Sequence, residues 1–188
     1  MGKKLSEMTL EELWQLFPIF LTEHKEDWKC WYLEEERLLK KFIFGSCRIS
    51  HIGSTAIKNI WAKPIIDILL EVPTNRNLQD YMEILINKGY ICMSQTERGM
   101  SFNKGYTEDG FAERVFHLHL RYIGDNDELY FRDYLIEHFD VAKKYEELKL
   151  SLWKKYEHDR DGYTQAKTEF IKEITNLAKI LYNGRYEI

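Results

Sequence analysis

One short hydrophobic stretch constrains the fold of this chain more than any other feature. Between Pro64 and Pro73 the sequence reads Ile-Ile-Asp-Ile-Leu-Leu-Glu-Val, residues 65–72. Most of these positions are apolar on both faces, which is typical of a central strand covered on both sides. Asp67 would cost several kcal/mol if it were buried there without a partner. We therefore expect Asp67 to face a metal, a lysine, or solvent at the edge of the sheet.

The rest of the chain alternates between helical and strand-like segments. Thr9 and Glu12 form a capping-box pattern, so a helix is expected from there to about Pro18. Apolar residues at helical spacing predict further helices over 27–42, 77–87, 129–158 and 163–182. Strands are expected over 47–52, 65–72, 90–93, 99–103 and 112–122. The last two should pair antiparallel, because the connection between them is short.

Charge is spread unevenly along the chain. The sequence holds 27 Lys and Arg against 31 Asp and Glu, a net charge of -4, which argues against binding nucleic acid or membrane through bulk positive charge. Residues 38–66 nevertheless contain no Asp or Glu. The basic residues of this window are Lys40, Lys41, Arg48, Lys58 and Lys63. A surface normally mixes its signs, so the window indicates an anion site.

A glycine turn lies inside this basic window. The residues His51-Ile52-Gly53-Ser54-Thr55 stand between a predicted strand and a short helical segment. Glycine lets the backbone approach a ligand closely, and free amides at a helix start favour negative charge. Neither a Gly-Lys-Ser/Thr sequence nor a G-x-G-x-x-G sequence occurs, which excludes a P-loop and the dinucleotide fingerprint.

Two further patterns could carry chemistry. His117 and His119 are two residues apart on a predicted strand, so both imidazoles point the same way, about 6.6 Å apart. They could converge on one ion or phosphate, although such a pair is also common on the polar face of an apolar strand. The spacings Tyr145/Lys149 and Tyr163/Lys167 are interpreted as packing of a lysine stem on a ring.

Cysteine usage bears on the cellular environment. The three cysteines, Cys30, Cys47 and Cys92, show no C-x-x-C spacing. The first residues lack the apolar segment of a secretory signal, and no apolar run is long enough to span a bilayer. We expect a reduced, cytoplasmic setting.

Several of these strings together resemble a known family. His51-Ile-Gly-Ser-Thr-Ala56 and the string from Ala62 to Ile68, Ala-Lys-Pro-Ile-Ile-Asp-Ile, resemble the signature of the GrpB family, part of the nucleotidyltransferase-like superfamily. Later strings follow in the family's order: residues 116–120, residues 131–135, Tyr145-x-x-x-Lys149 and residues 163–167. The resemblance spans roughly residues 28–176. One departure is Lys58-Asn59, where the family commonly has Pro-Gly.

The resemblance implies an α+β fold, with a nucleotidyltransferase-like mixed β-sheet flanked by helices and a C-terminal pair of long helices. A single domain over residues 1–188 is expected, divided into N-terminal helices (1–44), a mixed-sheet core (45–125) and C-terminal helices (126–188). Active members of the superfamily carry two acids in a D-x-D/E pattern on the central strand. Asp67 matches the first acid, and Leu69 stands where the second would be.

The first functional hypothesis is a nucleotidyltransferase-like protein that binds a nucleotide or another phosphate-bearing ligand. The residues expected to bind the ligand are His51, Gly53, Ser54, Thr55 and Lys63. Asp67 would bind a divalent metal, Mg²⁺ before Mn²⁺ or Zn²⁺. Asp67, His117 and His119 would serve the transfer of a nucleotidyl group to a small acceptor.

Two alternatives stay open. Leu69 favours a non-catalytic nucleotide-binding or regulatory module that has lost the second metal carboxylate. His117 and His119 could instead define an H-x-H metalloprotein unrelated to nucleotides. In each case the expected partner is a small molecule rather than bulk nucleic acid or a membrane, and the C-terminal helices are a candidate homodimer surface.

Overall fold

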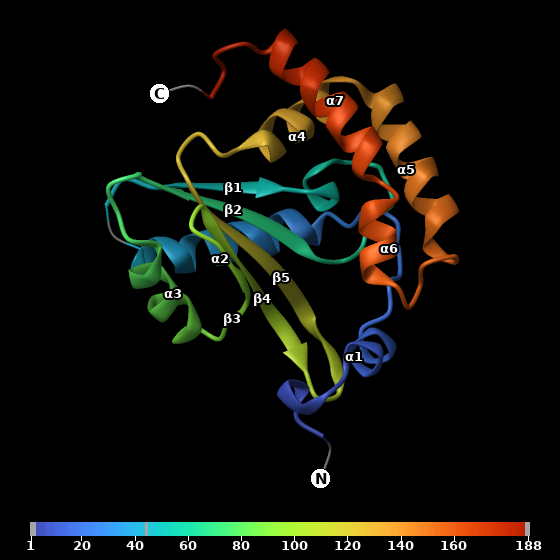
Figure 1. Cartoon of the computed structure of the whole chain (residues 1–188). Coiled ribbons are helices and arrows are strands. Elements are labelled where there is room, and N and C mark those ends of the chain that lie inside the picture. The colour runs from blue at the N-terminus through green and yellow to red at the C-terminus, as the bar shows by residue number, and fades with distance from the viewer. Residues whose placement is uncertain (1–2, 44, 187–188) are drawn as a thin grey trace.

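A five-stranded mixed sheet forms the centre of the computed structural model, which describes residues 3–43 and 45–186 (Figure 1). The strands are β1 (Arg48–Ile52), β2 (Ile66–Val72), β3 (Ile91–Gln95), β4 (Gly99–Thr107) and β5 (Gly110–Tyr122). Their order is β1-β2-β5-β4-β3, with β2 and β5 parallel and the other pairs antiparallel. The predicted α+β fold class is confirmed, as is the antiparallel pairing of β4 with β5.

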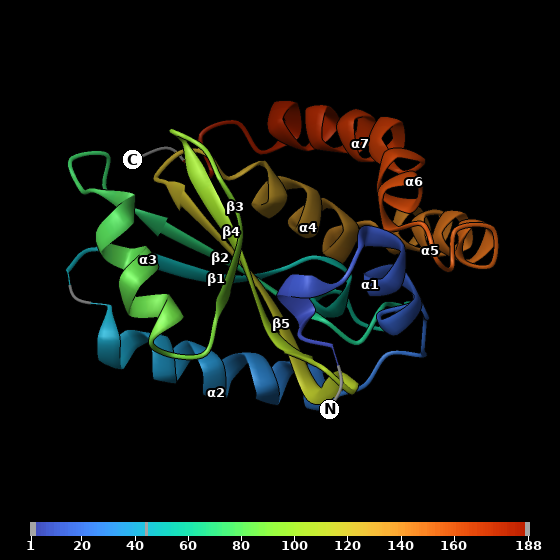
Figure 2. The same ribbon diagram turned by 60° about the horizontal axis from the view of Figure 1, so that its bottom comes forward.

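Two helices from the first half of the chain, α2 (Asp27–Phe42) and α3 (Leu78–Ile86), cover one face of the sheet. The 3-10 turn η1 (Leu5–Glu7) and α1 (Leu10–Leu16) lie instead near α6, beside the residues of β3 and β4 that point to the other face. The predicted capping box starts α1, because Thr9 Oγ1 accepts from the Glu12 amide at 3.2 Å and the Glu12 carboxylate accepts from the Thr9 amide at 2.7 Å. Helices α2 and α3 bury Trp28 and Leu85 against the sheet (Figure 2).

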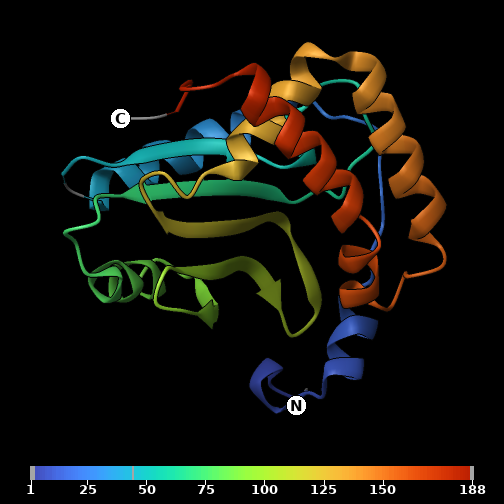
Figure 3. The same cartoon turned by 45° about the horizontal axis from the view of Figure 1, so that its top comes forward.

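The C-terminal helices cover the other face and curve around one end of the sheet toward α1 (Figure 3). They are α4 (Asp127–Glu137), α5 (Phe139–Trp153), α6 (Arg160–Gln165) and α7 (Thr168–Leu181). Each of the two predicted long helices is therefore two consecutive helices, broken at His138 and near Lys167. A straight helix of 30 residues would extend about 45 Å and leave the sheet behind. None of the helices within the described ranges is long and apolar enough to cross a membrane.

Three alternate residues of β2, Asp67, Leu69 and Glu71, lie on the side of the C-terminal helices. Leu69 is fully buried and packs with Ile52 and Leu129. Glu71 is also fully buried, and its carboxylate accepts from Arg48 Nη2 at 2.8 Å and from Asn126 Nδ2 at 3.0 Å. Both residues therefore stabilise the fold, and only Asp67, with a side chain 28% exposed, is left to face a ligand.

The described part of the chain does not include residues 1–2, 44 and 187–188. Ends of the predicted N-terminal helical segment (1–44) and of the predicted C-terminal helical segment (126–188) fall on these residues.

Candidate functional site

The carboxylate of Asp67 lies against the glycine turn. Asp67 pairs with Ile52 across the β1–β2 ladder, so Gly53 follows directly beside it. A Cβ atom added at Gly53 would lie 2.9 Å from Asp67 Cγ and closer still to Oδ2. Gly53 has φ +69 and ψ -174, a backbone conformation that is essentially restricted to glycine. Because residue 53 is glycine, the backbone of this turn can lie in direct contact with the Asp67 carboxylate.

Two imidazoles from β5 face the same carboxylate. In the parallel ladder Asp67 pairs with His117, and the distances from Asp67 Oδ1 are 3.3 Å to His117 Nδ1 and 4.0 Å to His119 Nε2. Burial acts to raise the pKa of Asp67, but hydrogen bonds from the two imidazoles outweigh it and hold that pKa well below its usual range. Asp67 is therefore an anion at neutral pH.

A hydrogen-bonded chain orients His117. Arg160 Nη1 donates to the Tyr106 hydroxyl oxygen at 2.9 Å, and that hydroxyl lies 2.8 Å from His117 Nε2. Because Nδ1 faces the Asp67 carboxylate, the ring proton of a neutral His117 is expected on Nδ1, which leaves Nε2 to accept from the Tyr106 hydroxyl. Burial lowers the pKa of His117, which favours this neutral form.

Four basic side chains surround this group: Lys63, Lys149, Lys167 and Arg160. Burial lowers the pKa of Lys63 to about 7, and the neighbouring charges of Lys167 and Arg160 lower it further against the attraction of Asp67. Burial and the charge of Lys167 likewise lower the pKa of Lys149 to about 7, against the attraction of Glu146. Burial lowers the pKa of Lys167 to about 8, opposed by Asp67. Mutual repulsion among buried cations is relieved when an anion binds between them.

Aromatic rings support these cations. The amine of Lys149 lies 4.9 Å from the ring centre of Tyr145, and that of Lys167 lies 4.2 Å from the ring centre of Tyr163, so the predicted packing of lysine on tyrosine is present. The hydroxyl of Tyr163 and Nε of Arg160 are buried and have no hydrogen-bond partner among the described residues. Buried polar groups of this kind are normally satisfied, so two unpaired donors beside the lysines indicate a missing acceptor.

The predicted site residues divide into two groups. Gly53, Lys63, Asp67, His117 and His119 come together, and Ser54 lies beside Tyr145 at the same end of the sheet.

His51 and Thr55 belong to a different arrangement. The buried Thr55 hydroxyl donates to the Ile65 carbonyl at 3.1 Å and lies 3.0 Å from His51 Nε2. Tyr32 stacks on the His51 ring at 4.7 Å, and burial lowers the pKa of His51 to about 4. Their polar atoms are occupied in holding the turn, so we assign these two residues to support rather than to ligand contact.

The donor set around Asp67 does not fit a two-metal centre. The position of a second carboxylate is Leu69, buried in a hydrophobic cluster. Both ring nitrogens of His117 are engaged, one with Tyr106 and one with Asp67. No group of three or more His, Cys, Asp and Glu residues within 3–43 and 45–186 is arranged to hold a metal ion. The cations that interact with Asp67 are Lys63 and Lys167, which suit an anionic ligand and repel a metal.

The residues that sequence reasoning missed are Tyr106, Lys149, Arg160 and Lys167. The two Tyr-x-x-x-Lys spacings were a signal for the lysines, since each places an amine and a ring on one side of a helix. Their convergence on Lys63 depends on how α5 and the α6–α7 junction fold over the sheet. Nothing in the sequence around Arg160 or Tyr106 connects them to His117.

Comparison with solved structures defines the class of fold. The poly(U) polymerase Cid1 with bound MgGTP matches with a TM-score of 0.50 and 14% identity over 68% of this chain and 42% of that one. The sheet and its helices thus have a nucleotidyltransferase-like fold. A crystal structure of the conserved protein GrpB from Enterococcus faecalis matches more fully, with a TM-score of 0.75 and 29% identity over 87% of this chain and 99% of that one.

Sequence comparison then places the chain within a family. The family model of GrpB protein matches residues 18–177, and the chain belongs to the GrpB family. It is 37% identical to the glutamate-rich protein GrpB of Alkalihalophilus pseudofirmus, over 84% of this chain and 94% of that protein. It is 34% identical to YqkA of Bacillus subtilis over 97% of this chain, which spans only 54% of that protein.

Proposed function

We propose that this protein binds a phosphate-bearing small molecule, with a nucleotide as the first candidate, at the end of the sheet where Gly53 meets Asp67. The observation that carries the proposal is the convergence of Lys63 and Lys167 on the Tyr163 ring, with their amines 5.7 and 4.2 Å from its centre, and with buried Lys149 close enough to interact with both charges. Three amines and a guanidinium against Asp67 and Glu146 leave an excess of positive charge that a di- or triphosphate would neutralise.

The unpaired donors add a second line of support. Lys149 is 2% exposed and donates one hydrogen bond, to the carbonyl of Trp61. An ammonium group carries three donors, so the others are free to meet phosphate oxygens. The Tyr163 hydroxyl and Arg160 Nε also lack an acceptor among the described residues. A phosphate group offers several acceptor oxygens at once and would satisfy such a set.

Binding without nucleotidyl transfer is the form of the proposal that the side chains favour. The two-metal scheme needs paired carboxylates to hold the ions that stabilise the attacking and leaving oxygens. Here Leu69 fills the second position and packs on Leu129, while Asp67 is held by His117. We assign Asp67 to orienting the imidazoles and balancing the lysines. The non-catalytic binding module is thus preferred to the transferase and to the H-x-H metalloprotein.

Calorimetric titration with ATP and with tripolyphosphate, each with and without Mg²⁺, tests this proposal. The variants are Lys149→Met and Lys167→Met, with Lys155→Met as the matched control because Lys155 is an exposed lysine of the same helical region. A charged hydrogen bond contributes about 1.5–3 kcal/mol, so each site variant should weaken binding roughly tenfold or more. Lys155→Met should leave the affinity unchanged.

Three results would contradict the proposal in different ways. Failure of both ligands to bind the unaltered protein would remove the phosphate site. Equal affinity in all three variants would place the ligand elsewhere. A strict requirement for Mg²⁺, accompanied by release of pyrophosphate from ATP when small acceptors are added, would restore the transferase hypothesis.

A further inference from the structure

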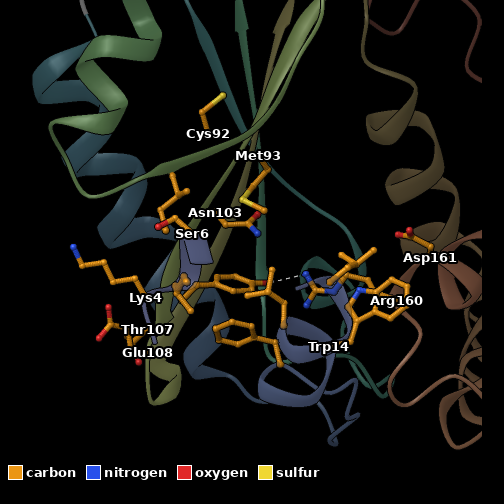
Figure 4. A pocket seen from close by; sticks show the side chains of 16 residues that line it. Lys4, Ser6, Trp14, Cys92, Met93, Asn103, Thr107, Glu108, Arg160 and Asp161 are labelled. Atoms are coloured by element: carbon orange, nitrogen blue, oxygen red, sulfur yellow. Dashed lines mark hydrogen bonds between the residues drawn. The ribbon is translucent and has the colours of Figure 1, made fainter. Parts of the chain in front are cut away.

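A large cavity adjoins the phosphate site and has no assigned role. It has a volume of about 820 Å³ and lies between the N-terminal segment, η1 with α1, and strands β3 and β4 (Figure 4). Its walls are mostly apolar and include the side chains of Leu10, Leu13, Trp14, Phe17, Met93 and Tyr106. Both its size and its lining are typical of sites for small organic ligands.

The cavity contains one neutral amide among these apolar walls. Asn103 of β4 is only 8% exposed, and its amide lies close to Met93, facing the interior of the cavity (Figure 4). The hydrogen bond drawn among the lining residues joins Tyr106 to Arg160, so none of those residues satisfies the Asn103 amide. An amide offers a donor and an acceptor side by side, a pattern that complements the edge of a nucleobase.

The wall of this cavity is shared with the phosphate site. Tyr106 and Arg160 line the cavity, and the same two side chains are linked to His117 at 2.8 Å and through it to Asp67 at 3.3 Å. The charge of Arg160 also interacts with that of Lys63 and lowers its pKa. The two sites therefore share the hydrogen-bonded pair of Tyr106 and Arg160 as a common wall, so a ligand that occupies both has to lie along that pair.

We infer that the cavity holds the aromatic base of a nucleotide whose phosphates contact the lysines, with Asn103 reading the hydrogen-bonding edge of that base. This inference rests on the proposed function and specifies its ligand as a nucleotide rather than inorganic polyphosphate or a sugar phosphate. Trp14, Phe17 and Tyr106 supply rings for stacking, and base–aromatic stacking contributes about 1–3 kcal/mol per base. Asn103 distinguishes bases because a mismatched edge leaves its amide unpaired.

Titrations that compare a nucleotide with its phosphate chain alone test the inference. The ligands are ATP, GTP, CTP, UTP and tripolyphosphate. The variants are Asn103→Leu and Met93→Arg, with Ser94→Arg as the control, because Ser94 is the next residue on β3, exposed and outside the cavity lining. At least one nucleotide should bind tenfold or more tightly than tripolyphosphate. Met93→Arg should abolish that advantage while Ser94→Arg retains it, and Asn103→Leu should reduce the discrimination among the four bases.

The results separate the two claims. If tripolyphosphate binds as tightly as every nucleotide, or if Met93→Arg and Ser94→Arg behave alike, the base site is overturned while the phosphate site stands. If neither polyphosphate nor nucleotide binds, both fall together. A fluorescent apolar probe that occupies the cavity, is expelled by Met93→Arg and is not displaced by any nucleotide would identify an apolar ligand instead and would also overturn the inference.

Discussion

Gly53 and Asp67 are packed so closely that no side chain fits between them. A Cβ atom at Gly53 would stand 2.9 Å from Asp67 Cγ, in a backbone conformation that only glycine adopts readily. The Asp67 carboxylate can therefore keep its position only while residue 53 is glycine.

Gly53→Ala should therefore both destabilise the protein and displace the Asp67 carboxylate. We expect a loss of about 2 kcal/mol or more in the free energy of unfolding and at least a tenfold loss in phosphate affinity. Denaturant titration and calorimetry measure the two effects. Gly89→Ala is the matched control, since Gly89 has φ +85 but nothing within 4 Å of an added Cβ. Equal losses in both variants would show that backbone strain alone is responsible.

Lys167→Met should stabilise the ligand-free protein at pH 7. Burial lowers the pKa of Lys167 to about 8, against about 10.4 for an exposed lysine, so the folded state disfavours the charged amine. The penalty is complete below pH 8 and disappears as the pH rises toward 10.4, because the unfolded chain binds more protons in that window. The free energy of unfolding of the unaltered protein should accordingly rise between pH 8 and 10, and that of the Lys167→Met variant should rise less. A variant that is less stable at pH 7, with an unchanged pH slope, would argue against a buried cation.

Tyr106→Phe should release His117 from its single tautomer. The change removes the bridge between Arg160 and His117 Nε2, while the ring still packs on Phe17 at a centroid distance of 4.7 Å. We expect a stability loss of about 1 kcal/mol and nitrogen NMR shifts of His117 that move from a pure Nδ1–H form toward a mixture. Tyr122→Phe, which removes a hydrogen bond to the Arg76 carbonyl, should leave those shifts unchanged. Identical His117 spectra in the unaltered protein and Tyr106→Phe would refute the relay.

Leu69→Asp, which places an acid two residues after Asp67 on β2, should unfold rather than activate the protein. Leu69 is fully buried against Ile52 and Leu129, so a carboxylate there lacks both solvent and a partner. A loss of several kcal/mol is expected by denaturant titration, whereas Leu69→Met should cost less than about 1.5 kcal/mol. A stable Leu69→Asp protein that binds Mg²⁺ would show that the site tolerates a metal centre after all.

Sequence reasoning was most successful where the signal is local. The capping box at Thr9, the bounds of α2 and the helix predicted over 77–87 depend on residues a few positions apart, and all three are present. The prediction of one helix over 129–158 was wrong, because the chain turns at His138 to follow the sheet and forms two helices there. The apolar periodicity continues across His138, so the sequence pattern does not reveal this turn. Glu71 could not be assigned from sequence either, since its partners Arg48 and Asn126 lie 23 and 55 residues away.

By itself the sequence determined the central strand, the lone acid within it, the glycine turn that must lie beside it, and the family to which the chain belongs. The strand, the acid and the turn follow from hydrophobic pattern, from the cost of burying a charge and from glycine's access to unusual backbone angles, whereas the family follows from the resemblance of several motifs. Only the tertiary structure decided that Lys149 and Lys167 join Lys63, that Tyr106 links Arg160 to His117, and that a cavity opens beside them. Those contacts join segments dozens of residues apart, and their geometry is set by how the helices pack on the sheet.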